Sequence, residues 1–366
     1  MDINRKKLEE FLRANRPAML RDIAEIAGCS LAAVSTTLNN SSSTTGVSAA
    51  KRQLILKAAE LVSYRPNFAA KSLVSRQSKT IGVCLRRTAR YANLGPFYEA
   101  PMLQGIEQAA RRSDYDILLV DNRDCVKKFA ENRMDALILL PGLYARKELN
   151  DIIAASPNII AIDYAPNDRI DAVIFDNFAA VRLAVEHLAG LGHRRIGFIG
   201  NLHENPMADV TTRCDAFLEI AQKMSLPTDG MVFNLSLWRK SIHTNQDYCS
   251  IEGMTAAKYF MSRPSDVRPT AVICYNDVVA SGAINAFTQA GLNLPGDMSI
   301  VGIDNSQICS FLKPALTSIR HPLEEMGELA VQRLIEKLAP TNMEYSKSLT
   351  VLQPELVVRN STAGPK

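Results

Sequence analysis

The sequence lacks the segments that direct a chain into or across a membrane. No apolar run reaches the roughly 18–20 residues that a transmembrane helix requires. The first residues, MDINRKKLEEFLRANRP, are basic but contain no apolar signal-peptide core. These absences predict a cytoplasmic protein. With 366 residues, 47% of them hydrophobic and 22% charged, the chain is long enough for two or three globular domains.

Motifs of catalysis and cofactor binding are also missing. No G-x-G-x-x-G follows a strand, because GLGHRR lacks the third glycine, and neither G-x-x-x-x-G-K-S/T nor G-x-S-x-G occurs. The seven cysteines are scattered without a C-x-x-C pair, which predicts reduced core thiols. His187 and His193 have no metal-ligand spacing and are expected to be structural. We therefore expect no enzyme activity, no cofactor and no metal.

Positive charge is concentrated near the N-terminus. Residues 1–80 contain 13 Lys and Arg against 6 Asp and Glu, whereas the rest of the chain contains 29 against 32. A compact basic segment on a slightly acidic body is typical of a nucleic-acid-binding head. Charge alone leaves open the alternative of a solvated helical face.

The basic segment has the pattern of a helix–turn–helix. The octet LRDIAEIA places apolar residues at helical spacing, Gly28 suits a left-handed turn, and Ser30 can cap a second helix. In that second helix we expect Leu31, Val34 and Leu38 to point to one side. The opposite side is then polar or small, with Ala32, Ser35, Thr36 and Asn39.

Two further helices are expected around this pair. Ser48 can cap a third helix that ends near Ser63. Its expected buried residues are Ile55, Ala58, Ala59 and Val62. Residues 1–16 form an additional amphipathic helix in this prediction, which Pro17 ends. Its apolar stripe consists of Ile3, Leu8, Phe11 and Leu12.

From Thr80 onward, apolar runs alternate with amphipathic helical stretches. The runs are TIGVCL, DILLVD, ALILLP, IIAID, AVIF, RIGFIG, MVFNL, AVICY and SIVGID. This alternation predicts parallel sheets with helices on both faces. Because nine strands are too many for one small sheet, we expect two lobes, with a crossing between Asp163 and Asp176.

Over residues 18–362 the sequence resembles the lactose-repressor/galactose-repressor family of bacterial transcription factors. The motifs are LRDIAEIAGCSLAAVSTTLNN, YRPNFAAKSL followed by KTIGV, VEHLAGLGHRRIGFIG, TAVICYNDVVASGAINAF, and SIVGIDNSQICSFLKPALTSIRHP. The resemblance implies an all-α helix–turn–helix head, a hinge helix, and a two-lobed α/β core like a periplasmic binding protein, with two parallel Rossmann-like sheets. It also implies a homodimer that binds pseudo-palindromic operator DNA and responds to a small metabolite.

The resemblance also implies domain boundaries. An N-terminal extension spans 1–17, the helix–turn–helix domain 18–64, the hinge helix and linker 65–79, and the effector-binding and dimerisation core 80–362. Within the core, the N-lobe takes about 80–175 and 305–334, and the C-lobe about 176–304 and 335–362.

By the same resemblance, the second helix of the head reads DNA in the major groove. The implied DNA-binding residues are Ser30, Leu31, Ala32, Ser35, Thr36, Asn39, Arg52, Asn67, Ala70, Lys71 and Leu73. Leu73 matches the hinge leucine that wedges into the minor groove; a plain linker is the alternative. Thr36 stands where arginine is common, which predicts an operator less dependent on guanine. For Leu31, core packing with Val34 is the alternative.

The resemblance places a small-molecule site between the core lobes. The implied effector-binding residues are Phe97, Tyr98, Asp163, Phe175, Arg213, Tyr248, Asn276 and Asp304. Carboxylates, a guanidinium and an amide suit the hydroxyls of a sugar, so we expect a repressor of carbohydrate utilisation. The alternatives are a purine effector, capping roles for Asp163, Asp304 and Asn276, and core roles for the two phenylalanines. A sugar-transport binding protein is disfavoured by the missing signal peptide.

Two departures from the family pattern are evident. The loop NNSSSTTGVS is longer than usual, and the stretch DNRDCVKKFAENRMDAL is shorter, which predicts a truncated helix in the first lobe. The C-terminal segment has no heptad repeat, so we expect a dimer and not a coiled-coil tetramer.

Overall fold

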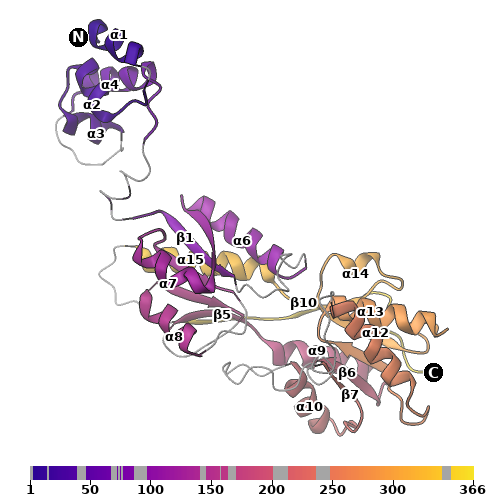
Figure 1. Cartoon of the computed structure of the whole chain (residues 1–366). Coiled ribbons are helices and arrows are strands. Elements are labelled where there is room, and N and C mark those ends of the chain that lie inside the picture. Colours follow the sequence, from indigo (N-terminus) through magenta and orange to yellow (C-terminus); the bar gives the residue numbers. More distant parts are fainter. Residues whose placement is uncertain are drawn as a thin grey trace. The chain divides into compact units, whose positions relative to one another are not determined.

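Two compact units, Met1–Arg76 and Gln77–Lys366, make up the chain (Figure 1). The computed structural model describes residues 3–14, 16–38, 47–66, 72, 75, 77–85, 97–140, 146–156, 158–163, 170–200, 213–235, 248–339 and 348–366. Within these ranges, no helix has both the length and the apolar character needed to cross a membrane.

The first unit contains the predicted helix–turn–helix. Its helices are α2 (Leu20–Ala27), α3 (Leu31–Leu38) and α4 (Ala49–Leu61). Gly28 ends α2 in the left-handed conformation, with φ 60°. Ser30 Oγ accepts a hydrogen bond from Ala33 N (3.2 Å), and Ser48 Oγ accepts one from Lys51 N (3.4 Å). The predicted turn and both predicted N-caps are therefore confirmed.

The head packs around a small apolar core to which α2, α3, α4 and an additional helix before them contribute. The residues predicted to be buried on the third helix, Ile55, Ala58, Ala59 and Val62, are all buried. The additional helix α1 (Arg5–Ala14) packs against α2, and Asn4 N donates to Ile26 O (2.8 Å). Leu8 and Phe11 contact the core, but Leu12 is 59% exposed. The expectation for Leu12 was wrong because it lies on the outer side of α1.

The second unit contains two six-stranded sheets, and all nine predicted strands are present. The first sheet is parallel throughout. In spatial order its strands are β11 (Leu349–Leu352), β5 (Asp171–Phe175), β4 (Ile159–Ile162), β3 (Ala136–Leu139), β1 (Thr80–Leu85) and β2 (Asp116–Asp121). Its helices are α6 (Glu99–Arg112), α7 (Cys125–Ala130), α8 (Arg146–Ala155) and α15 (Leu323–Leu338). We call this sheet and its helices the first lobe.

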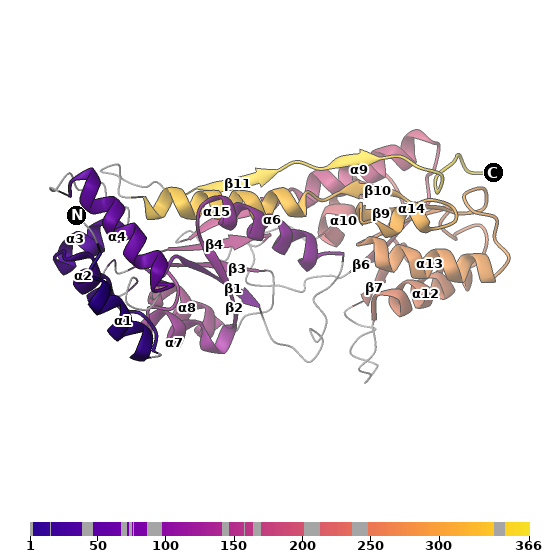
Figure 2. The ribbon, with the colours of Figure 1, turned by 90° about the horizontal axis from the view of Figure 1, so that it is seen from above.

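The second sheet is parallel except at one edge. In spatial order its strands are β12 (Glu355–Val357), β10 (Thr317–Arg320), β9 (Ser299–Asp304), β8 (Ala271–Cys274), β6 (Ile196–Gly200) and β7 (Val232–Asn234). β12 runs antiparallel to β10. The long helices of this second lobe are α9 (Asn177–Gly190), α10 (Arg213–Lys223), α12 (Tyr248–Met261) and α13 (Asp277–Gln289). Figure 2 shows the helices of both lobes layered over their sheets.

The chain passes between the lobes at places that differ in part from the expectation. It first crosses after β5, at the end of the predicted range. β10, expected in the N-lobe, instead pairs with β9 in the second sheet. A short connection containing α14 (Ile308–Phe311) brings this buried strand back beside β9. β11, expected in the C-lobe, pairs with β5 in the first sheet. The second and third crossings therefore follow β10 and β11.

Alternating side chains of each strand enter different apolar clusters. In β3, Ile138 packs with α6 and α15, whereas Leu137 packs with α7 and α8. α6 and α15 approach closely through Gly105, where a Cβ atom would collide with the backbone of Glu324. The predicted truncation is confirmed, because α7 has only six residues. The first lobe is thus a three-layer α/β/α sandwich with one short outer helix.

Candidate functional site

α3 presents a small, uncharged surface. Its buried residues are Val34 and Thr37, while Ser30 and Ala32 are exposed and Ser35 and Thr36 are half-buried. Leu31 is 53% exposed, so the alternative that it packs in the core with Val34 is wrong. This surface of α3 can form hydrogen bonds through hydroxyl groups and apolar contacts with a bound molecule.

Basic side chains lie on the neighbouring helix. Lys51 and Arg52 are exposed in the first turn of α4, directly after the cap Ser48. Helix N-termini and basic side chains both favour phosphate groups. Five of the predicted DNA-binding residues lie outside the described residues: Asn39, Asn67, Ala70, Lys71 and Leu73.

Two carboxylates stand at the ends of strands in different lobes. Asp163 follows β4 in the first sheet and Asp304 ends β9 in the second. Both have positive φ, 52° and 113°, and Asn305 has φ 51°. Non-glycine residues in this region are strained, and such strain concentrates at functional sites. Their side chains are only 11% and 9% exposed.

A histidine that sequence reasoning missed lies between these carboxylates. The His321 side chain is fully buried. Its Nδ1 is 3.4 Å from Asp304 Oδ1, and its Nε2 is 3.6 Å from Asp163 Oδ2. Among the described residues, Nε2 has no hydrogen-bond partner. Its sequence signal was its place at the end of the family motif SIVGIDNSQICSFLKPALTSIRHP, because the run TSIR before it is mostly polar and does not mark a strand.

Arg213 completes the charged cluster from α10. Its Nε donates to Asn177 Oδ1 (2.7 Å), and Nη1 donates to the backbone oxygen of Tyr275. Its Nη2 lies 3.4 Å from His321 Nδ1 and 3.7 Å from Asp304 Oδ1. These contacts fix the guanidinium beside the imidazole, and the side chain is 15% exposed.

Aromatic rings form two walls of the cluster. Phe175 stacks on His321 with ring centroids 4.0 Å apart and an interplanar angle of 18°. It is 1% exposed, so it also belongs to the core. Tyr98 donates from its hydroxyl to Asp163 Oδ2 (2.5 Å), and its ring meets His321 edge-on. Burial and the charge of Asp163 raise the Tyr98 pKa well above its ordinary value, so the hydroxyl remains a donor.

The remaining predicted residues have less direct roles. Phe97 is half-buried beside Tyr98. Asn276 caps α13, because its Oδ1 accepts from Val279 N (2.8 Å), which leaves its amide nitrogen as a donor. Tyr248 begins α12, but its side chain is not among the described parts of the chain. The structure thus brings together Tyr98, Asp163, Phe175, Arg213 and Asp304 around His321.

A further buried carboxylate, that of Asp277, supports the Asp304 turn. Asp277 Oδ2 accepts from Ser306 N (2.7 Å) and Ser306 Oγ (2.9 Å), and Oδ1 accepts from Ser318 Oγ (2.6 Å). Burial and the nearby charge of Asp304 raise its pKa to about 6. Asp277 therefore ties the loop after β9 to β10, next to His321.

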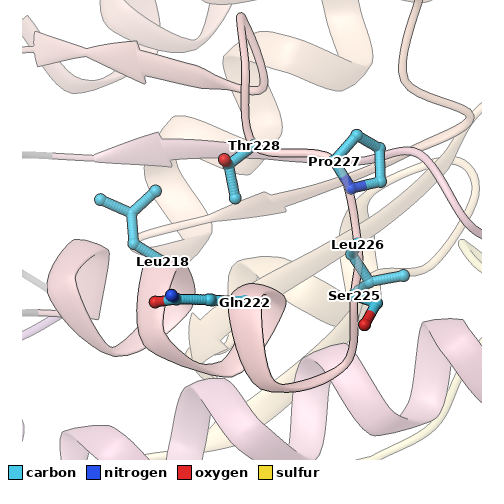
Figure 3. Close-up of a pocket in the computed structure, with 6 residues that line it drawn as sticks. All are labelled: Leu218, Gln222, Ser225, Leu226, Pro227 and Thr228. Atoms are coloured by element: carbon cyan, nitrogen blue, oxygen red, sulfur yellow. The ribbon is translucent and has the colours of Figure 1, made fainter.

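A pocket lies elsewhere, on the second lobe. It forms where α10 ends and the chain turns towards β7 (Figure 3). Its lining is Leu218, Gln222, Ser225, Leu226, Pro227 and Thr228. None of the predicted effector residues contributes to it, so it is separate from the charged cluster.

Comparisons with known proteins agree with this architecture. Residues 19–67 match the family described as bacterial regulatory proteins, lacI family, and residues 185–362 match the periplasmic binding protein-like domain. An HTH-type transcriptional repressor PurR from Photobacterium profundum is 28% identical, covering 94% of this chain and 98% of that protein. A ribose operon repressor from Haemophilus influenzae is 29% identical with the same coverage.

Solved structures resemble the whole chain. A lac repressor dimer bound to operator and an anti-inducer has a TM-score of 0.77 at 25% identity, covering 95% of this chain and all of that one. A complex of the transcriptional regulator CelR with cellobiose has a TM-score of 0.64 at 23% identity, covering 94% and 100%. The two matched domains and the relatives of nearly full coverage show that the chain belongs to the lacI family of bacterial regulatory proteins, which are DNA-binding transcriptional regulators and not enzymes.

Proposed function

We propose that the protein is a cytoplasmic, homodimeric repressor whose operator affinity is controlled by a small, sugar-type effector bound between the core lobes. The observation that carries this proposal is the position of Asp163 and Asp304, one from each sheet, on either side of His321. A ligand that replaces these mutual contacts would touch both lobes at once.

The chemistry of the cluster suits a neutral compound with several hydroxyl groups. Asp163 and Asp304 accept hydrogen bonds from hydroxyls, and Arg213 and the Asn276 amide nitrogen donate them. The half-buried Tyr98 and the neighbouring aromatic rings suit the apolar face of a sugar ring. Two carboxylates in one small site disfavour an anionic ligand such as a sugar phosphate.

Such a site can control DNA binding by linkage. A ligand that contacts both lobes binds one arrangement of them more tightly than another and shifts the population towards it. The same coupling must then change the affinity for operator DNA. We propose relief of repression by the effector as the direction of control.

The operator side of the proposal rests on α3. Exposed Leu31 and Ala32, together with Thr36, provide apolar and hydroxyl contacts to base edges, while Ser30, Ser35 and Arg52 suit phosphates. The hinge, with Leu73 as its wedge and Asn39, Asn67, Ala70 and Lys71 as further contacts, is proposed from the resemblance alone.

A purine effector is the second candidate. Its support is the similarity to several repressors named PurR. Aromatic side chains such as Tyr98 and Phe175 would suit a flat base. The two carboxylates favour the sugar, since a nucleobase presents fewer hydroxyl donors.

Thermal-shift screening against neutral sugars, sugar phosphates and nucleobases tests both candidates. A compound at 100 times its Kd adds about 2.7 kcal/mol to the free energy of unfolding. We expect a neutral sugar to raise the Tm of the wild type and not of Asp304→Asn. Asp297→Asn, which removes a carboxylate paired with Lys366 outside the site, should respond like wild type. A shift with nucleobases alone would reject the sugar effector.

A further inference from the structure

Asp135, in the turn before β3, holds the residues through which the chain enters the core. Its Oδ1 accepts from Ser78 N (2.7 Å) and Ser78 Oγ (2.8 Å), and its Oδ2 accepts from Lys79 N (2.8 Å). Hydrogen bonds from backbone N–H groups to a carboxylate are charge-assisted and stronger than neutral ones. Both oxygens of Asp135 are therefore committed to two consecutive residues.

Ser78 and Lys79 also make contacts with residues other than Asp135. Lys79 has φ 48°, a conformation that costs energy in a non-glycine residue and persists only where contacts enforce it. Its backbone oxygen accepts from Asp116 N (2.8 Å), and its ammonium lies 4.5 Å from the ring centre of Tyr115. Ser78 is 4% exposed, and its backbone oxygen accepts from Thr80 Oγ1 (2.9 Å).

The hydrogen bonds of Asp135 to Ser78 and Lys79 are not required to fix the register of β1. β1 begins at Thr80 and pairs in parallel with β2 over its whole length and with β3 over four residues. Its register is therefore fixed without Ser78 and Lys79. The Asp135 contacts extend the ordered backbone to residues before the strand, and the left-handed Lys79 sets the direction in which the chain leaves the lobe.

The anchor lies at the junction of the two compact units. The first unit ends at Arg76 and the second begins at Gln77. Any force that the core exerts on the DNA-binding head along the chain passes through Ser78 and Lys79. Asp135 lies at the amino end of β3, whereas Asp163 follows the carboxyl end of the adjacent parallel strand β4. The anchor and the charged cluster thus lie at opposite edges of one hydrogen-bonded sheet.

We infer that Asp135 is a positioning residue for specific DNA binding. Its hydrogen bonds restrict the backbone of Ser78 and Lys79, which connect the first lobe to the segment that leads to the head. This inference rests on the proposed operator binding. Without the Asp135 hydrogen bonds, the backbone of Ser78 and Lys79 can rotate. A movement of the first lobe then no longer determines the position at which the segment towards the head begins. Non-specific binding needs only the charge of the head and is not expected to depend on the anchor.

The test uses full-length protein and two duplexes of equal length at one salt concentration. One duplex is selected from a random-sequence pool on the wild type, and the other is an unselected sequence. We expect Asp135→Asn to weaken binding of the selected duplex about tenfold and to leave the unselected duplex within about twofold. Asp114→Asn, which removes an exposed carboxylate in the turn before β2 at the same sheet edge, is the matched control.

A second variant separates a loss of positioning from a loss of stability. Two glycines inserted between Arg76 and Gln77 add conformational freedom between the first lobe and the head and leave Asp135 unchanged. If Asp135 acts by restricting this freedom, Asp135→Asn should cause little further loss of affinity for the selected duplex in the protein with the insertion. Additive losses, or equal behaviour of the Asp135 and Asp114 variants, would overturn the inference. A wild type that selects no duplex would instead overturn the proposed function.

Discussion

His321 Nε2 lies 3.6 Å from Asp163 Oδ2, and this contact joins the end of a second-lobe strand to the end of a first-lobe strand. The imidazole is fully buried, and within the described ranges this nitrogen has no hydrogen-bond partner. A buried polar atom without a partner is costly. A ligand hydroxyl that reached it would remove this cost, which connects His321 directly to effector affinity.

Replacing His321 with leucine should therefore weaken effector binding. We expect the Kd of the sugar found by thermal shift to rise at least about tenfold, or about 1.4 kcal/mol. Isothermal titration calorimetry measures this. His187→Leu is the control, because His187 bonds Thr362 Oγ1 (3.0 Å) away from the site. Unchanged affinity in the His321 variant would contradict the assignment.

Thr36 should set the base preference of the reading helix. Its short side chain cannot form the two hydrogen bonds that arginine makes to guanine, each such pair being worth about 1–3 kcal/mol. Selection from random duplexes should yield no strict guanine at the position facing Thr36, and Thr36→Arg should create one. A strict guanine with the wild type would reject this prediction.

The hinge prediction can be tested through Leu73. Leu73→Ala should weaken binding of the selected duplex about tenfold, because the wedge that stabilises the kinked duplex is lost. Binding of an unselected duplex, and its dependence on salt, should hardly change. Val74→Ala serves as the neighbouring apolar control. Equal losses for both duplexes would mean that Leu73 does not act as a wedge.

Stability should fall in mild acid because of His193. This residue is 1% exposed, and burial lowers its pKa. Its nitrogens lie 2.8 Å from Thr270 Oγ1 and 2.8 Å from Ala363 O. Below about pH 6.5, the ordinary histidine pKa, the unfolded chain binds a proton that the folded chain excludes. The stabilisation is complete above that pH and is lost as the pH falls towards the lowered folded value.

Urea unfolding at about pH 7.5 and pH 5.5 measures this effect. Between about pH 7.5 and about pH 5.5 the change in midpoint should be more unfavourable for the wild type than for His193→Gln, whereas proton uptake by Asp277, whose pKa is raised to about 6, opposes the change equally in both proteins. A variant with the same pH dependence as the wild type would assign the effect to other groups.

Much of the fold was predictable because the core strands are continuous apolar runs. β1, β3 and β4 are buried on both faces, so their sequences contain almost only apolar residues. β10, β11 and β12 were not predicted because they are short and mix polar with apolar residues. Without them, the second and third lobe crossings could not be located.

The charged residues Asp163 and Asp304 of the site were predicted, but the histidine between them, His321, was not. Asp163 and Asp304 end strands that the sequence marks clearly, and the family resemblance assigned both. His321 follows a strand that was not predicted, and only the return of β10 beside β9 brings it between them. Leu31 shows the opposite case: helical spacing places it beside Val34, yet at the first turn of α3 it remains exposed.

The order in which the strands join each sheet has a consequence for synthesis. β11 completes the edge of the first sheet and β12 the edge of the second, and both come from the end of the chain. Ser361 and Ala363 then bond to the second lobe through Ile300 and Ser299. Neither sheet is complete until these last strands have been synthesised, and a nascent chain cut short anywhere before β11 leaves an open edge on each sheet that is exposed to aggregation.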